Sequence, residues 1–298
     1  MQYRKFGTTG WTVSAIGFGG MPLSINTSRP SEEDAIKVIH AAFDAGITFW
    51  DTADCYCLDA ADFGHNERLF GKALAQLPAG KREGVTLVTK CGLTRPEGRW
   101  ERDASPAYIR NAVESSLKNL RLPALPVEQY HRIDSNTPME DTYGELMKLQ
   151  KQGKIVHIGA SNHSVAEMTR ALATGVKIVS LQNQYSRCHR NPELDGTLEF
   201  TRQKGIAFLP WSPIDGMGGA KNLGSKHANV AKIAAAHNVS PQRVALAWLL
   251  STGAHVIPIP GSTKIAHVQD CAAAADLALT PDELALLASE APQQGPPH

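Results

Sequence analysis

The sequence predicts an α/β fold: a (β/α)8 TIM barrel with an N-terminal β-hairpin and extra C-terminal helices. Short β-rich segments alternate with helical segments along the whole chain, and eight such units follow one another without a break in composition. Polar or aromatic residues stand at the end of one predicted strand after another, which is where the active sites of such barrels gather. A length of 298 residues suits one barrel, so a single domain over residues 1–298 is expected.

The elements are expected in a regular order after a hairpin-like start at residues 3–6 and 11–13. Strands are predicted at 15–19, 48–51, 85–90, 129–132, 155–161, 178–183, 207–211 and 256–260. Helices are predicted at 31–45, 67–77, 106–120, 139–152, 165–174, 192–204, 228–237 and 241–251. Ser31 and Ser240 are typical N-caps, and the second is followed by a proline at the first helical position. Glycines mark four helix ends, namely Gly46, Gly153, Gly175 and Gly205.

Charge gives no sign of an electrostatic partner. Thirty basic and twenty-nine acidic residues leave a formal charge of +1, and no long block of like charge is present. Nucleic-acid and membrane partners are therefore not expected. The N-terminus lacks an apolar signal core, which favours a cytoplasmic location. Oligomeric state is left open by the sequence.

Five cysteines form an odd set without Cys-x-x-Cys spacing, namely Cys55, Cys57, Cys91, Cys188 and Cys271. This pattern argues against a disulfide framework and a zinc ribbon, so reduced thiols are expected. A metal site built from Cys55, Cys57, Cys91 and His131 is an alternative. Cys-x-Cys does not match the usual ligand spacing for zinc, and we therefore predict no metal.

Four residues predict an acid–base site. Asp51, Lys90 and His131 each stand where a short apolar run stops, and Tyr56 follows the first run by a few residues. Tyrosine alone is a poor acid near neutral pH, with a pKa of ~10. An adjacent ammonium lowers the pKa of tyrosine, a carboxylate holds the ammonium, and an imidazole orients or relays the proton. Together they make a proton donor that needs no metal, as the reduction of a carbonyl group requires.

Other common catalytic motifs are missing. The run Gly17-Phe18-Gly19-Gly20 lacks the third glycine, the helix start and the acidic residue of a dinucleotide fingerprint, so a tight loop at the barrel mouth is the better interpretation. No P-loop, His-Glu-x-x-His or Gly-x-Ser-x-Gly motif is present. The commonest nucleotide hydrolase, metalloprotease and serine hydrolase interpretations are therefore excluded.

Over essentially its full length the chain resembles the aldo-keto reductase superfamily. The resemblance rests on Asp51-Thr52-Ala53-x-x-Tyr56, Asn66-Glu67-Arg68-Leu69-x-Gly71, Thr89-Lys90, His131-Arg132-x-Asp134, Gly159-x-Ser161-Asn162, Gln182-Asn183-x-Tyr185-Ser186, Trp211-Ser212-Pro213 and Ile259-Pro260-Gly261-Ser262. It implies a barrel that uses NADPH, less often NADH, to reduce aldehydes and ketones. It also implies that Tyr56 is the general acid, that Lys90 and Asp51 tune it, and that His131 positions the carbonyl oxygen.

The predicted cofactor site uses strand ends and the last loop. Ser161, Asn162 and Gln182 complement the two donors and one acceptor of a nicotinamide carboxamide, and Trp211 can stack on the ring. The alternatives are that Trp211 is a core aromatic residue that fills the barrel and that Gln182 is an amide in a surface loop. Ser212 and the glycines of residues 215–219 allow backbone approach to a pyrophosphate. The remaining predicted cofactor residues are Gly20, Met21, Pro213, Gly261, Ser262, Thr263, Lys264, His267 and Asp270.

The cofactor is expected to be NADP(H), with NAD(H) less favoured, because the segment 261–264 offers backbone N–H groups, two hydroxyls and an ammonium to a 2′-phosphate. The chain departs from the family pattern at several places. Cys57 replaces a common glycine, and residues 58–63 form an insert. In the last loop His267 and Cys271 stand where an arginine and an asparagine are common, and Asp270 replaces a glutamate.

The leading functional prediction is an NADP(H)-dependent carbonyl reductase acting on a small-molecule carbonyl substrate by direct hydride transfer. One alternative is a nicotinamide-binding regulatory subunit resembling the potassium-channel β subunits. Another is an isomerase or aldolase in which Lys90 forms a Schiff base, which is disfavoured because Asp51 would keep the amine protonated. The physiological substrate and the reaction direction are not indicated by the sequence.

Overall fold

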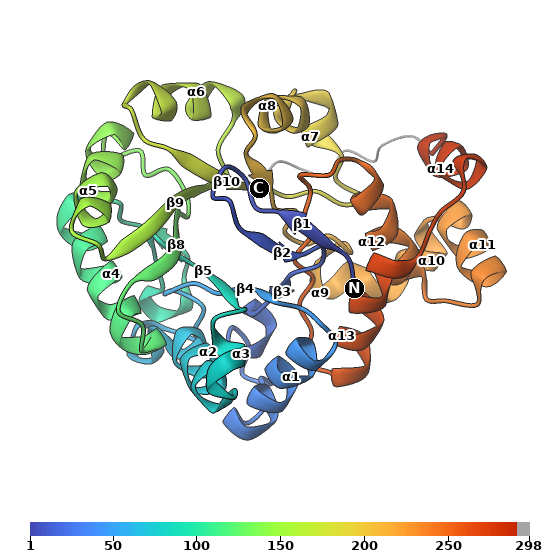
Figure 1. The fold of residues 1–298 in the computed structure, drawn as a ribbon, viewed down its shortest axis with the longest axis horizontal. Coiled ribbons are helices and arrows are strands. Elements are labelled where there is room, and N and C mark those ends of the chain that lie inside the picture. The colour runs from blue at the N-terminus through green and yellow to red at the C-terminus, as the bar shows by residue number, and fades with distance from the viewer. Residues whose placement is uncertain (291–298) are drawn as a thin grey trace.

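A closed barrel of parallel strands forms the body of the molecule, as Figure 1 shows. The computed structural model describes residues 1–290, and residues 291–298 of the predicted domain lie outside the described part. Seven strands form one parallel sheet in the order β11-β10-β9-β8-β5-β4-β3. Their bounds are β3 Phe18–Gly19, β4 Phe49–Asp51, β5 Thr86–Cys91, β8 Leu125–Tyr130, β9 Ile155–Ser161, β10 Ile178–Gln182 and β11 Ala207–Phe208.

Residues 256–260 close the barrel as its eighth member. On one side the Ile257 N–H donates to the Phe208 carbonyl at 2.8 Å. On the other side the carbonyls of Pro258 and Pro260 accept hydrogen bonds from the backbone N–H groups of Gly17 and Gly19, each at 2.9 Å. The two prolines have no N–H to donate, so this edge is joined through carbonyls alone. The predicted strand at 256–260 is therefore present as a closing segment whose hydrogen bonding is irregular.

The N-terminal hairpin covers the end of the barrel at which the strands begin (Figure 1). Strands β1 (Tyr3–Lys5) and β2 (Thr12–Ser14) pair antiparallel, as predicted. Phe6 beside this hairpin packs on Phe49 inside the barrel, with ring centroids 5.1 Å apart. Trp11 contacts His157 near the start of β9 at 4.6 Å between ring centroids. The hairpin therefore covers the barrel interior at this end, and the strands end at the opposite side of the barrel.

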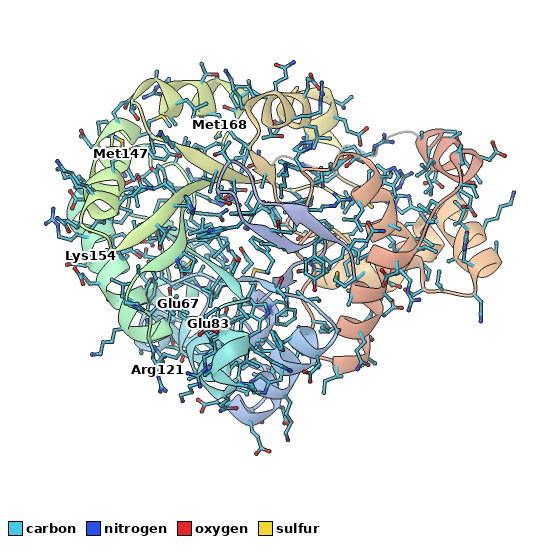
Figure 2. The ribbon with its side chains drawn as sticks, viewed as in Figure 1. Glu67, Glu83, Arg121, Met147, Lys154 and Met168 are labelled. Carbon is cyan, nitrogen blue, oxygen red and sulfur yellow. The ribbon has the colours of Figure 1, made fainter. Side chains whose placement is uncertain are left out.

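Helices surround the barrel, and their buried faces form the larger of its hydrophobic cores. The principal helices are α1 Glu32–Asp44, α2 His65–Gln76, α4 Pro106–Leu120, α5 Met139–Lys151, α6 Val165–Ala173, α8 Thr197–Lys204, α11 Ala228–His237, α12 Pro241–Ser251, α13 Ile265–Ala272 and α14 Pro281–Ala288. Met168 of α6, labelled in Figure 2, is completely buried beneath its helix. Ser31 and Ser240 cap α1 and α12 through side-chain hydrogen bonds, as predicted.

Short elements complete the chain between the principal ones. They are η1 Met21–Leu23, η2 Ala60–Asp62, α3 Ala79–Arg82, β6 Leu93–Thr94, η3 Pro96–Gly98, β7 Glu101–Arg102, α7 Asn191–Leu194, α9 Gly216–Gly219, η4 Ala220–Asn222, α10 Leu223–Lys226 and η5 Ala273–Asp276. None of the helices among residues 1–290 has the length and apolarity needed to cross a membrane.

Several sequence predictions differ from the observed elements, and the strands predicted at 15–19 and 207–211 are shorter than expected, at Phe18–Gly19 and Ala207–Phe208. The helix predicted at 192–204 is split into α7 and α8, because Gly196 takes a left-handed conformation with φ 82°. The strand predicted at 129–132 begins earlier, at Leu125, and pairs with β5 and β9. Its first residues were missed because Pro126 and Glu128 interrupt the apolar pattern. Helix α14 was not among the predicted ranges, although the capping box formed by Thr280 and Glu283 was a detectable signal.

Candidate active site

Three of the predicted catalytic residues stand at the ends of neighbouring strands. Asp51 ends β4, Lys90 lies near the end of β5, and His131 directly follows β8. The pairing of β4 with β5 and of β5 with β8 sets them side by side. Lys90 Nζ donates to Asp51 Oδ2 at 2.8 Å, and this ion pair is almost fully buried.

Tyr56 reaches the same point from the loop after β4. Lys90 Nζ lies 3.1 Å from Tyr56 Oη and 2.8 Å from the Thr52 carbonyl, so one ammonium holds both ends of this loop. The Tyr56 side chain is 6% exposed. The phenol is therefore largely shielded from water and fixed in position by its bond to Lys90.

The pKa of Tyr56 corrects one expectation from the sequence. Burial raises the pKa of Tyr56, the Lys90 ammonium lowers it by less, and the net pKa lies above the usual value for tyrosine. The prediction that Lys90 would bring this pKa below its usual value is therefore wrong for this structure. Tyr56 is fully protonated at neutral pH, which is the form that a proton donor needs. The Lys90 ammonium, 3.1 Å from the phenol oxygen, favours the phenolate form over the neutral one.

Lys90 itself stays charged. Burial lowers the pKa of Lys90, but Asp51 and Tyr56 together outweigh burial and leave that pKa above its ordinary value. Burial raises the pKa of Asp51, against the effect of Lys90. A protonated Lys90 amine has no lone pair, so it is a poor nucleophile for a Schiff base.

His131 is a neutral imidazole beside the phenol. Burial and then the Lys90 charge lower the pKa of His131 well below its usual value. Its ring stands edge-on to that of Tyr56, with centroids 5.9 Å apart. Its Nδ1 lies 3.5 Å from the Cys55 sulfur, so a thiol faces that side of the ring. A neutral ring suits the predicted role of orienting a carbonyl oxygen without bringing a second positive charge.

Gln182, predicted to bind a nicotinamide, contacts the buried carboxylate of Asp51. Its Nε2 donates to Asp51 Oδ1 at 2.7 Å and to Gln129 Oε1 at 3.1 Å. Both of its amide hydrogens are therefore engaged within the protein. Gln129, which no sequence motif singled out, continues this chain of hydrogen bonds to Ser180 Oγ at 2.9 Å. Gln129 is a fully buried polar residue on β8, and a polar residue inside a predicted strand is the signal that could have pointed to it.

Ser161, Asn162 and Trp211 come together, as predicted. Asn162 Nδ2 lies 2.9 Å from Ser161 Oγ, and Trp211 Nε1 donates to Asn162 Oδ1 at 3.0 Å. Asn162 also donates to the His131 carbonyl at 3.1 Å, which joins this group to the predicted catalytic residues. Asn162 and Ser212 both have positive φ, 56° and 49°. Such strained residues cluster at functional sites.

The predicted glycines lie where the ends of β3 and of segment 256–260 meet. A Cβ on Gly261 would stand 2.3 Å from the Gly19 carbonyl oxygen, and one on Gly20 would stand 2.4 Å from the Phe70 ring. Glycine is therefore required for packing at both positions. Met21 begins the short helix η1 directly after Gly20, and Pro213 is buried in the loop after β11.

Only some of the residues predicted to bind the adenosine end of the cofactor lie close to one another. Ser262, Thr263 and Lys264 precede α13, and Ser262 Oγ lies 3.4 Å from His267 Nδ1. Lys264 and His267 are exposed. Asp270, in contrast, accepts from Arg243 at 2.6 Å and from Ser240. Arg243 of α12 is a charged neighbour of this loop that sequence reasoning missed, because it lies 27 residues away in the chain.

The thiols named for an alternative metal site do not form one. Among the described residues, the one group of three ligand atoms that all lie within 4.8 Å of one another is Cys188, Asp215 and His227. Cys55, Cys57 and Cys91 therefore do not converge with His131 as metal ligands.

Comparison with known proteins identifies the family. The model of the aldo/keto reductase family matches residues 15–290. The chain belongs to the aldo-keto reductase family. Its resemblance to this family, inferred from the motifs, is thereby confirmed, and with it an oxidoreductase class of enzyme. A probable aldo-keto reductase 1 from Glycine max is 36% identical over 295 residues, which cover 90% of this chain and 82% of that protein.

Solved aldo-keto reductases have the same fold. A thermostable aldo-keto reductase in complex with the inhibitor epalrestat is similar with a TM-score of 0.82 and 26% identity, covering 97% of this chain and 99% of that one. An aldo-keto reductase from Klebsiella pneumoniae in complex with NADPH is similar with a TM-score of 0.80 and 27% identity, covering 96% and 94%. The predicted (β/α)8 barrel is confirmed by these similarities and by the strand order.

Proposed function

We propose that this aldo-keto reductase reduces an aldehyde or ketone to an alcohol by direct hydride transfer from NADPH, with Tyr56 as the general acid. The observation that carries the proposal is the contact of Lys90 Nζ with both Asp51 and Tyr56, at 2.8 and 3.1 Å. A buried phenol bonded to a fixed ammonium can give its proton to a developing alkoxide. The expected substrate is a small carbonyl compound, with no nucleic-acid or membrane partner and in a cytoplasmic location.

The residues at the strand ends fit a nicotinamide cofactor. The group made by Ser161, Asn162 and Trp211 combines a hydroxyl, an amide and an indole beside His131, and its backbone is strained at Asn162. Ser212 has a second positive φ, after β11. We assign the ring end to these residues, and the phosphate end to Pro213, residues 261–264 and His267. NADP(H) is favoured over NAD(H) because Lys264 is an exposed ammonium just before α13. When bound, the cofactor supplies the hydride.

The protein's own part in the reaction is to move one proton and to place one oxygen. In this proposal the neutral imidazole of His131 orients the carbonyl oxygen next to the Tyr56 hydroxyl. Tyr56 then donates its proton to that oxygen as negative charge develops, and Lys90 stabilises the phenolate at 3.1 Å. Asp51 and Gln182 keep Lys90 in place through the ion pair and the amide bond to the carboxylate. Such a positioned general acid contributes typically ~10²- to 10⁴-fold in rate.

The decisive experiment distinguishes turnover from simple cofactor binding. The purified full chain is incubated with an excess of NADPH and a panel of aldehydes, ketones and sugars, and the nicotinamide absorbance is followed. We expect many equivalents of NADPH to be oxidised with at least one carbonyl class. A regulatory subunit, the alternative function, would bind NADPH but consume no more than about one equivalent, and that result would overturn the proposal.

A further inference from the structure

A second cluster of side chains that can bind a metal lies apart from the proposed catalytic residues Asp51, Tyr56, Lys90 and His131. Cys188 stands after β10, Asp215 stands after β11, and His227 directly precedes α11. The Cys188 sulfur is 2.8 Å from Asp215 Oδ2 and 3.2 Å from His227 Nε2, and the last two atoms are 3.9 Å apart. Three segments far apart in the sequence thus place a thiol, a carboxylate and an imidazole in one triangle. We propose that these three side chains bind a zinc ion.

The donor set and its dimensions suit that metal. Zinc binds cysteine sulfur at ~2.3 Å and histidine nitrogen or carboxylate oxygen at ~2.0–2.2 Å, usually with tetrahedral geometry. Those bond lengths place tetrahedral ligand atoms ~3.3–3.6 Å from one another. The observed separations of 2.8, 3.2 and 3.9 Å bracket these values, so shifts of well under 1 Å bring all three atoms into position. Water fills the fourth position.

A fixed second layer of hydrogen bonds supports the imidazole. Zinc-bound histidines typically donate their other ring N–H to a carboxylate, which fixes the tautomer. Here His227 Nδ1 lies 3.2 Å from Glu290 Oε2 and leaves Nε2 to face the sulfur. The Glu290 carboxylate is held in turn by Arg187 Nη2 and the Asn229 N–H, each at 2.9 Å. The orientation that metal binding requires is thus already set.

A nucleophilic cysteine explains the cluster less well than a metal site. The Cys188 thiol donates a hydrogen bond to Asp215 Oδ2 at 2.8 Å, which holds the sulfur in its protonated, weakly nucleophilic form. A nucleophilic thiolate needs a neighbouring positive charge, and at Cys188 the negatively charged carboxylate of Asp215 stands in that position instead. A divalent cation, in contrast, is attracted by the same carboxylate and displaces the thiol proton. The proposed site differs from the sequence prediction of no metal. The sequence did not indicate it, because Asp215 and His227 lie 27 and 39 residues from Cys188 and form no recognisable ligand spacing.

The test measures metal binding directly and needs no substrate. Metal-free full-length protein is titrated with Zn²⁺ by calorimetry and with Co²⁺ by absorbance. We expect one ion per chain, the release of about one proton per ion, and a thiolate-to-cobalt charge-transfer band. The charge-transfer band and tight binding should vanish in Cys188→Ser and in His227→Gln. Glu290→Gln should weaken binding by ~10- to 100-fold, as the loss of such supporting carboxylates does.

Matched controls separate this site from general effects. Cys271→Ala removes a different buried thiol, and His237→Gln removes a histidine that also pairs with a carboxylate, Glu283, at 2.6 Å. Both variants should bind the ion as the wild type does. Circular dichroism and the rise of the thermal midpoint with added Zn²⁺ check that each variant is folded. Absence of saturable binding to the wild type, or unchanged binding and spectra in Cys188→Ser, would overturn the proposal.

Discussion

Gln182 donates a hydrogen bond of 2.7 Å to Asp51, across the barrel from β10 to β4. The other carboxylate oxygen of Asp51 is held by Lys90. The buried carboxylate is thus satisfied by one charged and one neutral donor. Because Lys90 also bonds Tyr56 and the Thr52 carbonyl, it has more partners in the site than Asp51 has. The two members of this ion pair should therefore differ in the effect of their removal.

Lys90→Met should lower turnover more than Asp51→Asn. The methionine leaves the Asp51 charge buried without its counter-charge, which costs ~3–5 kcal/mol of stability. It also leaves the phenolate of Tyr56 unsupported. The Asp51→Asn change, in contrast, keeps an oxygen for Lys90 and the shape of the side chain. Steady-state kinetics and chemical denaturation of both variants check this order, and the reverse order in turnover would mean that the roles are wrongly assigned.

Tyr56→Phe should lower turnover by ~10²- to 10⁴-fold while NADPH still binds. The change removes only the hydroxyl, and the ring remains packed against His131. Single-turnover kinetics with an unactivated aldehyde, together with NADPH fluorescence titration, measures the two effects separately. Tyr108→Phe is a matched control, because its hydroxyl donates to Asp54 and to the Leu93 carbonyl and touches none of the four proposed catalytic residues. Near-wild-type turnover by Tyr56→Phe would exclude this residue as the acid.

Lys264→Ala should raise KM for NADPH far more than KM for NADH. Lys264 is exposed just before α13, where it is assigned to the 2′-phosphate that only NADPH carries. Turnover at saturating NADPH should stay nearly unchanged, because a contact remote from the hydride is made equally in ground and transition states. Lys232→Ala, an exposed lysine of α11, is the control. Equal loss toward both cofactors would show that this contact is placed wrongly.

Glu128→Gln should stabilise the protein at alkaline pH. Among the described residues, the buried carboxyl group of Glu128 has no charged partner and no close hydrogen bond, with only the Cys91 thiol facing it, and burial raises the pKa of Glu128 to about 8. Between the unfolded pKa of ~4.3 and a folded pKa of about 8, the native state binds the extra proton. Stability due to this group therefore falls as pH rises through that window. Glutamine cannot ionise and removes this dependence.

Denaturant unfolding of wild type and Glu128→Gln between pH 5 and pH 9 measures the effect. We expect the difference in unfolding free energy to be small at pH 5 and to grow in favour of the variant toward pH 9. A constant difference across this range would contradict the assignment. Glu145→Gln is a suitable control, because that buried carboxylate is already paired with Arg110 at 2.9 Å.

Much of the fold followed from local patterns in the sequence. The alternation of β-rich and helical segments predicted the barrel, since each parallel strand needs a crossover helix to return the chain. The N-caps at Ser31 and Ser240 fixed two helix starts through bonds within four residues. Asp51, Lys90 and His131 were recognised because a polar residue at the end of a buried strand faces the open end of a barrel.

Only the tertiary structure decided which side chains meet across the barrel. The bond from Gln182 to Asp51 spans 131 residues, and the partners of Cys188 come from two other segments. The sequence by itself determined the order of strands and helices, because capping, turns and periodicity act over a few residues. It could not determine the high pKa of Tyr56 or the pairing of Asp270 with Arg243. Those depend on burial and on neighbours brought close by the closed barrel, and no local pattern records either of them.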